Sequence, residues 1–80
     1  MKYQFTTNGT CSRLIDIEIM DGRIADVKFT GGCNGNLKGL AAMVKGCTPE
    51  EVIDRLEGIE CGNKGTSCPD QLAKALKQLV

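Results

Sequence analysis

Five cysteines in a chain of 80 residues are the side chains best suited to chemistry. Four of them lie where one predicted element gives way to the next, each beside a glycine or a capping residue: Cys11, Cys33, Cys61 and Cys68. A thiolate is a soft metal ligand, so a group of thiolates favours zinc, Cu(I) or an iron–sulfur cluster. Because the chain contains no histidine, a site made by this chain alone would be rich in sulfur.

The position of these cysteines is more informative than their spacing. No two form the Cys-x-x-Cys pair that zinc ribbons and ferredoxins use. However, Cys33 and Cys68 both fall near the start of a predicted helix, where the helix dipole and free N–H groups stabilise a thiolate. Asp70 or another oxygen ligand would complete such a site. We therefore expect Cys11, Cys33, Cys61 and Cys68 to bind zinc or an iron–sulfur cluster, the alternative being small buried side chains packed against glycine bends.

Other candidate sites are weaker. Cys47 lies between Gly46 and Thr48 in a predicted helix-to-helix turn, and we interpret it as structural or incidental. The glycine-rich segments 31–36 and 62–67 match no phosphate-binding motif and indicate tight turns. Without histidine, and with no base beside any serine, a hydrolytic triad is not expected. We predict no catalytic residue, and we do not expect the chain to be an enzyme on its own.

Alternating apolar residues predict three strands, over residues 2–7, 12–19 and 23–30. Each strand has one apolar face, which for the third comprises Ala25, Val27 and Phe29. A three-residue loop, Met20–Gly22, would pair Ile17 with Ala25 and keep the apolar side chains of both strands together. The sequence therefore predicts an antiparallel sheet with one buried face.

Helical spacing and capping residues predict three helices after the strands. The first follows the glycine bend, with Asn34 or Asn36 as its cap, and ends at Gly46. The second starts at the capping pattern of residues 48–51 and the third at that of residues 67–70. Strands followed by helices indicate an α+β fold, a three-stranded antiparallel sheet with three helices packed on one face. The length of the chain predicts a single domain, residues 1–80.

The composition of the chain argues against several functions and cellular locations. Ten basic residues balance ten acidic ones, so no basic excess favours nucleic-acid binding. No segment reaches the roughly 20 apolar residues that span a bilayer. Residues 1–8 lack the apolar run of a signal peptide. We therefore expect a cytoplasmic protein that binds neither nucleic acid nor membrane.

Four segments of the chain resemble the TSCPD domain family. They are NGTCS (8–12), GGCNGNLKGL (31–40), GCTPEEVIDRLEGIECG (46–62) and TSCPDQLAKAL (66–76). Members of this family include small free-standing bacterial proteins. Similar segments stand at the C-terminal end of adenosylcobalamin-dependent ribonucleotide reductases. The resemblance implies a link to that enzyme, as an accessory thiol or metal module.

The order of the motifs is also similar to that of U-type iron–sulfur cluster assembly scaffolds. There, one cysteine precedes a β-hairpin, a second follows it before a helix, and a third opens a late helix. By that resemblance Cys11, Cys33 and Cys68 would be cluster ligands, and Cys61 would be an additional one. Arg13 and Ser67 stand where the scaffold has an aspartate and a histidine.

Three functions remain open from the sequence. The first is a small metal-binding domain, scaffold-like or accessory to ribonucleotide reduction, whose partner would be a reductase or a cluster-delivery protein. The second is a thiol redox module of a ribonucleoside-diphosphate reductase, in which Cys61 and Cys68 form a reversible disulfide. The third is a metal-free interaction domain, for example a homodimer that pairs through an edge strand or through the C-terminal Leu79–Val80.

Overall fold

The computed structural model describes residues 1–7, 9, 12–32, 34–60 and 65–79, which form three strands followed by three helices. The elements are β1 (Lys2–Thr6), β2 (Ser12–Met20), β3 (Arg23–Gly31), α1 (Asn34–Val44), α2 (Pro49–Leu56) and α3 (Cys68–Lys77). The strands form an antiparallel sheet in the order β1-β2-β3. The predicted α+β fold is confirmed.

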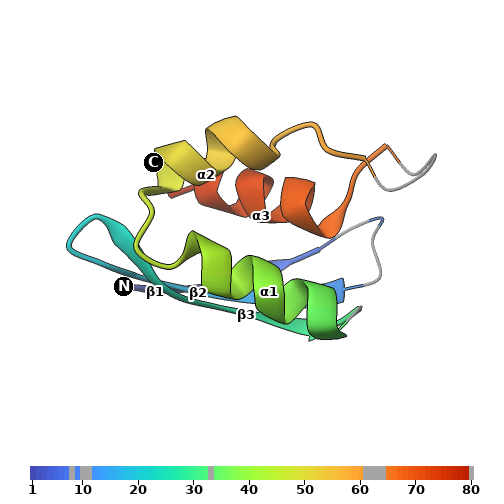
Figure 1. Cartoon of the computed structure of the whole chain (residues 1–80), viewed down its shortest axis with the longest axis horizontal. Helices are drawn as coiled ribbons and strands as arrows, with labels where there is room; N and C mark the ends of the chain where they lie inside the picture. The colour runs from blue at the N-terminus through green and yellow to red at the C-terminus, as the bar shows by residue number, and fades with distance from the viewer. Residues whose placement is uncertain (8, 10–11, 33, 61–64, 80) are drawn as a thin grey trace.

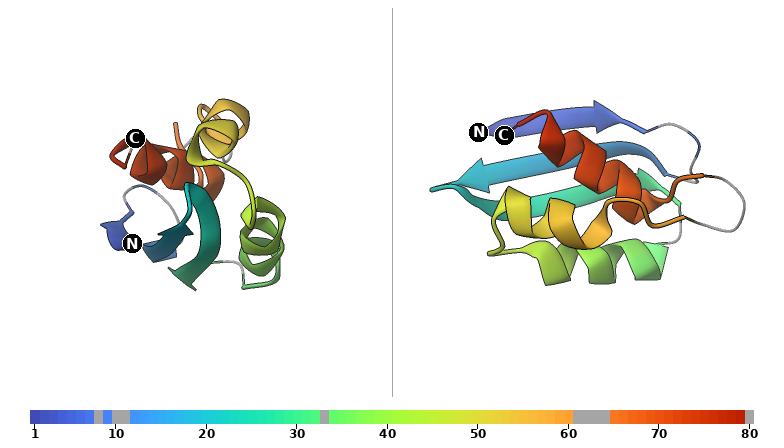
Figure 2. Two further views of the ribbon diagram at one scale, coloured as in Figure 1. Left: turned by 90° about the vertical axis from the view of Figure 1, so that its left-hand side faces the viewer. Right: turned by 90° about the horizontal axis from the view of Figure 1, so that it is seen from above.

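The helices lie on the same side of the sheet (Figure 1). Helix α1 packs beside β3, whereas α3 runs obliquely over the strands and α2 packs against α3 (Figure 2). This arrangement removes the apolar face of the sheet from water, which is the main driving force for folding. The largest fully buried side chains come from β2, β3 and α3: Ile15, Ile17, Ile24, Leu72 and Leu76.

The turn between β2 and β3 differs from the prediction of a three-residue loop that pairs Ile17 with Ala25. The turn contains only Asp21 and Gly22, both at positive φ (55° and 75°). This conformation suits a two-residue hairpin, because its twist matches that of the strands. Ile17 pairs with Val27, and a β-bulge leaves Ala25 as an extra residue in β3. The bulge returns the apolar side chains to one face.

The predicted starts of the last two helices are confirmed. Thr48 caps α2 in a full capping box with Glu51, and Ser67 caps α3 by accepting from the backbone N–H of Asp70 at 3.1 Å. The prediction for α1 was less accurate. This helix begins at Asn34, so Asn34 and Asn36 both lie inside its first turn, and neither is the cap residue that precedes it. In the part of the chain that the structure describes, no helix has the length and apolar character needed to cross a membrane.

Candidate functional site

Of the four cysteines predicted as ligands, the described residues include Cys68 alone. Cys11, Cys33 and Cys61 lie outside the described residues. Cys68 is the first residue of α3, its side chain is partly buried, and its thiol is free. Ser67 caps the helix and Pro69 occupies its first turn, where the missing N–H of proline is no loss. The local sequence therefore fixes the thiol at a helix N-terminus, as predicted.

The thiol of Cys68 contacts the hydroxyl of Ser12. The two atoms, Sγ and Oγ, are 3.2 Å apart, and either can be the donor. Ser12 is the first residue of β2 and is only 3% exposed. It directly follows Cys11 in the sequence. The contact therefore joins the start of β2 to the start of α3.

A second β-bulge, near the start of β2, directs Ser12 toward α3. Counting back from buried Ile15, strict alternation would bury Arg13 and expose Ser12. The pairing with β3 instead shifts between Ser12 and Leu14, and the structure buries Ser12 and exposes Arg13. An extra residue in one strand re-aims side chains in this way. The bulge thus places a hydroxyl, and not a guanidinium, beside the thiol.

Gly32, which directly precedes Cys33 in the sequence, lies against the same end of β2. Its φ is +81°, and a Cβ at this position would lie 3.2 Å from the backbone N of Ser12 and 2.8 Å from Cδ1 of Leu37. Only glycine combines that backbone conformation with so close an approach. The segment that leads into α1 therefore touches the residue that contacts Cys68.

Asp70 holds the two ends of the connection between α2 and α3 together. Its Oδ1 accepts from the backbone N–H of Gly58 at 2.8 Å, and its Oδ2 accepts from the Thr66 hydroxyl at 2.5 Å. The ammonium of Lys74, one turn later in α3, lies 3.1 Å from Oδ2. Gln71 adds a bond, because its Nε2 donates to the Thr66 hydroxyl oxygen at 2.9 Å.

Ser67 adds a second link across the same connection. Its hydroxyl donates to the backbone carbonyl of Ile59 at 2.7 Å, while accepting from the N–H of Asp70. The chain leaves this network at Ile59 and returns to it at Thr66, and Cys61 stands between these two residues in the sequence. The bonds from α3 therefore close the base of the segment that carries Cys61.

The environment of Asp70 keeps its carboxyl group ionised. Burial by itself would raise the pKa of Asp70, whose residue is 3% exposed. The hydrogen bonds from Thr66, Gly58 and Lys74 favour the charged form more strongly, so the pKa lies below its ordinary value. Both carboxylate oxygens are engaged within the fold, which argues against the predicted use of Asp70 as an oxygen ligand.

No group of three or more His, Cys, Asp or Glu side chains that could hold a metal ion is found among the described residues. Those residues do not include Cys11, Cys33 or Cys61. The donor set of four thiols without histidine still fits zinc and iron–sulfur clusters, both of which occur with four cysteine ligands.

Cys47 belongs to a different part of the molecule. Its side chain packs against the hydrophobic core, and its Sγ lies 3.8 Å from the carbonyl oxygen of Met43. Its own backbone carbonyl accepts from the N–H of Ile24 at 2.9 Å. These contacts agree with the structural interpretation of this cysteine.

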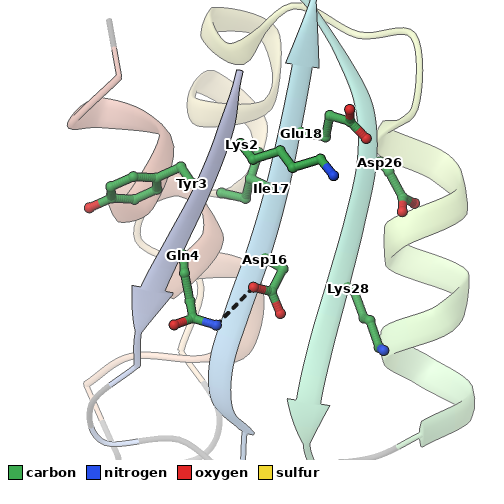
Figure 3. Close-up of a pocket in the computed structure, with 8 residues that line it drawn as sticks. All are labelled: Lys2, Tyr3, Gln4, Asp16, Ile17, Glu18, Asp26 and Lys28. Carbon is green, nitrogen blue, oxygen red and sulfur yellow. Dashed lines mark hydrogen bonds between the residues drawn. The ribbon is translucent and has the colours of Figure 1, made fainter.

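The open face of the sheet carries the charged residues of the strands, around a shallow hollow (Figure 3). Gln4 donates to Asp16 across the strands at 3.0 Å, and Asp26 lies 3.5 Å from the ammonium of Lys45. Lys28 pairs with Asp16 in the strand register, whereas Glu18 pairs with Asp26. This face therefore carries both acids and bases, including two acids directly opposite each other. It is the charged strand face that the sequence predicts.

Sequence reasoning did not single out Ser12, Thr66 or Gln71 as site residues. Two signals were available. Ser12 directly follows a candidate ligand, and the apolar alternation of β2 would bury Arg13, an unfavourable place for a guanidinium. Thr66 and Gln71 became recognisable only once the fold brought their side chains together.

A comparison with protein families agrees with the resemblance to the TSCPD domain family. No curated protein and no solved structure matches the chain significantly. The family model of the TSCPD domain matches residues 1–80, a range that includes the strands, the helices and all five cysteines. The chain therefore belongs to the TSCPD domain family.

Proposed function

We propose that this TSCPD domain is a small metal-binding domain, which holds zinc or an iron–sulfur cluster through Cys11, Cys33, Cys61 and Cys68. The observation that carries the proposal is the contact of Ser12 with Cys68 and of Gly32 with Ser12. Ser12 follows one proposed ligand in the sequence, and Gly32 precedes another. Chain neighbours of two proposed ligands therefore meet at a third.

The segment between α2 and α3 supports the fourth ligand. Gly58 and Ile59, which stand three and two residues before Cys61, are bonded to Asp70 and Ser67 at the start of α3. The same turn of α3 carries Cys68. This network would keep the segment that contains Cys61 at the same end of the molecule.

A metal also suits the size of the domain. A chain of 80 residues buries only about 60–65% of the surface of its unfolded chain, so its core is thin, and small domains often gain stability from a structural metal. Zinc in such a site would contribute folding energy, whereas an iron–sulfur cluster would carry electrons. We propose that the domain acts scaffold-like or as an accessory to ribonucleotide reduction, with a reductase or a cluster-delivery protein as its partner.

Metal analysis and a visible spectrum of the protein purified without oxygen test this function. Replacing any one of Cys11, Cys33, Cys61 and Cys68 by serine should lower the metal content severalfold or more. Cys47→Ser is the matched control and should retain the metal, because its side chain packs against the core. A wild-type protein that is metal-free and fully stable would refute the proposal, as would equal metal loss in Cys47→Ser and Cys68→Ser.

The closed base of the segment between α2 and α3 favours a second function, a thiol redox module. In it, Cys61 and Cys68 would pass two electrons and two protons to a disulfide of a partner protein and become a disulfide themselves. A titration against glutathione buffers should then show one pair of thiols oxidised at physiological potentials. If no disulfide forms there, this function is excluded.

Unchanged folding and partner binding in a variant with all four cysteines replaced by serine would favour the metal-free interaction domain.

A further inference from the structure

We infer that Ser12 is a positioning residue of the proposed metal site, whose hydroxyl donates a hydrogen bond to the sulfur of Cys68 when that sulfur is a thiolate. The role in metal binding rests on the proposed function. The contact itself does not, because the structure places Ser12 Oγ 3.2 Å from Cys68 Sγ.

The direction of the bond follows from the chemistry of the two groups. A thiol can donate or accept, whereas a thiolate has no proton and can only accept. Cysteine binds a metal as the thiolate. Once Cys68 is a ligand, a hydrogen bond between these two groups can therefore run only from the hydroxyl of Ser12 to the sulfur.

The fold holds Ser12 in place from several directions. The carbonyl oxygen of Ser12 accepts from the hydroxyl of Thr7, and the backbone N–H of Thr7 donates to the carbonyl of Arg13 at 3.0 Å. Gly32 packs against its backbone N. The β-bulge then turns the side chain toward α3. Bulges are over-represented next to functional sites, where they re-aim a side chain.

A hydrogen bond to a ligand sulfur changes how strongly the sulfur donates electrons to a metal. The donor stabilises the negative charge of the thiolate, so the energy of the sulfur lone pairs falls. Partners that hydrogen-bond to metal ligands affect affinity, and losing one typically weakens binding about 10- to 100-fold. Hydrogen bonds to the sulfurs also help to set cluster reduction potentials.

The experiment compares Ser12→Ala with Ser67→Ala, two variants that each remove one hydroxyl near Cys68. The first measurement is the infrared S–H stretching band of the metal-free protein, with Cys68→Ser identifying the band of Cys68. We expect Ser12→Ala to shift this band. Ser67→Ala should leave it in place, since the Ser67 hydroxyl bonds to Ile59 and Asp70 instead. Ser67→Ala should lower stability, because Ser67 caps α3.

The second measurement is titration with Co²⁺, a spectroscopic substitute for zinc. Ser12→Ala should weaken Co²⁺ binding about 10-fold, because the sulfur of Cys68 is no longer held in position. It should also move the sulfur-to-metal charge-transfer band to longer wavelength, because the sulfur lone pairs rise in energy. Ser12→Thr keeps a hydroxyl and should restore both values. It also decides the matter if Ser12→Ala fails to fold, since a band unlike that of the wild type would then count against the role of the hydroxyl.

The two measurements separate this inference from the proposed function. If the wild type binds Co²⁺ through Cys68 and Ser12→Ala changes neither band nor affinity, the positioning role is overturned and metal binding stands. If the wild type binds no Co²⁺ while the S–H band still shifts in Ser12→Ala, the contact is real, but its role in metal binding is overturned together with the proposed function.

Discussion

The two ends of the sheet are connected to the helices in different ways. At the hairpin end, which comprises Ile24, Gly46, Cys47 and Thr48, the connection is mainly between backbone groups, and one side chain, the guanidinium of Arg23, donates to the carbonyl of Gly46 at 2.8 Å. Ile24 donates to the carbonyl of Cys47 at 2.9 Å and accepts from the N–H of Gly46 at 2.8 Å. At the cysteine end, which comprises Ser12, Gly32, Thr66, Ser67, Cys68 and Asp70, side chains make it. Backbone bonds tolerate most side chains, so the residue types matter far more at the cysteine end.

This difference shows that side chains of specific types are concentrated at the cysteine end. The described residues at the cysteine end include a buried carboxylate, three buried hydroxyls and a glycine that permits a close backbone approach. Polar groups are costly to bury unless they are hydrogen-bonded, so a thin core would be simpler with apolar residues there. The proposed metal site at this end would account for their presence.

The largest expected effect comes from glycine. Gly32→Ala would strain a backbone at φ +81° and press a methyl group against Ser12 and Leu37. The positive φ costs about 1–2 kcal/mol, and overpacking costs about 1–3 kcal/mol. We expect a loss of about 2–5 kcal/mol in the free energy of unfolding, measured by urea denaturation.

Gly46→Ala at the hairpin end is the matched control. Gly46 has a similar φ of +85°, but a Cβ there would meet no atom within 4 Å. This variant should therefore lose only the conformational term, about 1–2 kcal/mol. Equal losses in the two variants would show that the close approach of Gly32 to β2 contributes nothing.

The next effect is the loss of the Asp70 network. In Asp70→Asn, an amide NH₂ replaces one carboxylate oxygen. The NH₂ cannot accept a hydrogen bond, although Thr66, Gly58 and Lys74 all present donors to this side chain. Because hydrogen bonds to charged groups contribute about 1.5–3 kcal/mol, we expect a loss of about 2–3 kcal/mol in urea denaturation. Asp54→Asn, which removes a charge from an exposed position of α2, should change stability by less than about 0.5 kcal/mol. A similar result for both variants would contradict the role of Asp70.

The same comparison explains what the sequence could predict. Strand faces and helix caps follow from local patterns, so the starts of α2 and α3 and the element order are correct. The predicted register of β2 and β3 is wrong, because bulges form where the packing between strands outweighs the strict alternation of side chains along a strand. Neither the bulge at Ala25 nor the one near Arg13 has a reliable local signature.

The cysteine end shows the same limit. The sequence placed Cys68 at a helix start, since capping residues surround it. It did not reveal Ser12 as its neighbour, because the two are 56 positions apart and a bulge reverses the expected face. Asp70 could be read only as a residue of the first turn, since its bond to Gly58 depends on how α2 packs against α3.

A smaller effect distinguishes the two helix caps. Thr48→Ala at the hairpin end removes a cap and should cost about 1 kcal/mol. Ser67→Ala removes a cap and also the bond to the carbonyl of Ile59, and a further hydrogen bond is worth about 1 kcal/mol. We therefore expect a loss of about 2 kcal/mol for Ser67→Ala, measured by urea denaturation. If Thr48→Ala were the more damaging variant, the Ser67–Ile59 link would be of no consequence.

The smallest effect is the dependence of stability on pH. The pKa of Asp70 is lower in the folded protein than its unfolded value of about 3.9. Its charged form therefore stabilises the fold above that pH, and the contribution is lost as the pH falls through the folded pKa. The difference in unfolding free energy between wild type and Asp70→Asn should shrink as the solution is acidified below about pH 4.

Glu51 at the hairpin end gives the counterpart to this measurement. Its pKa is also lowered, chiefly by the hydrogen bond from the backbone N–H of Thr48, so the contribution of this carboxylate is lost in the same direction. Glu51 is exposed, whereas Asp70 is buried among its partners. Because water screens an exposed group, the difference between wild type and Glu51→Gln should change less with pH than the difference for Asp70→Asn. If the larger change occurred at Glu51, the specific side-chain bonds of the fold would be concentrated at the hairpin end, and the contrast between the two ends would be lost.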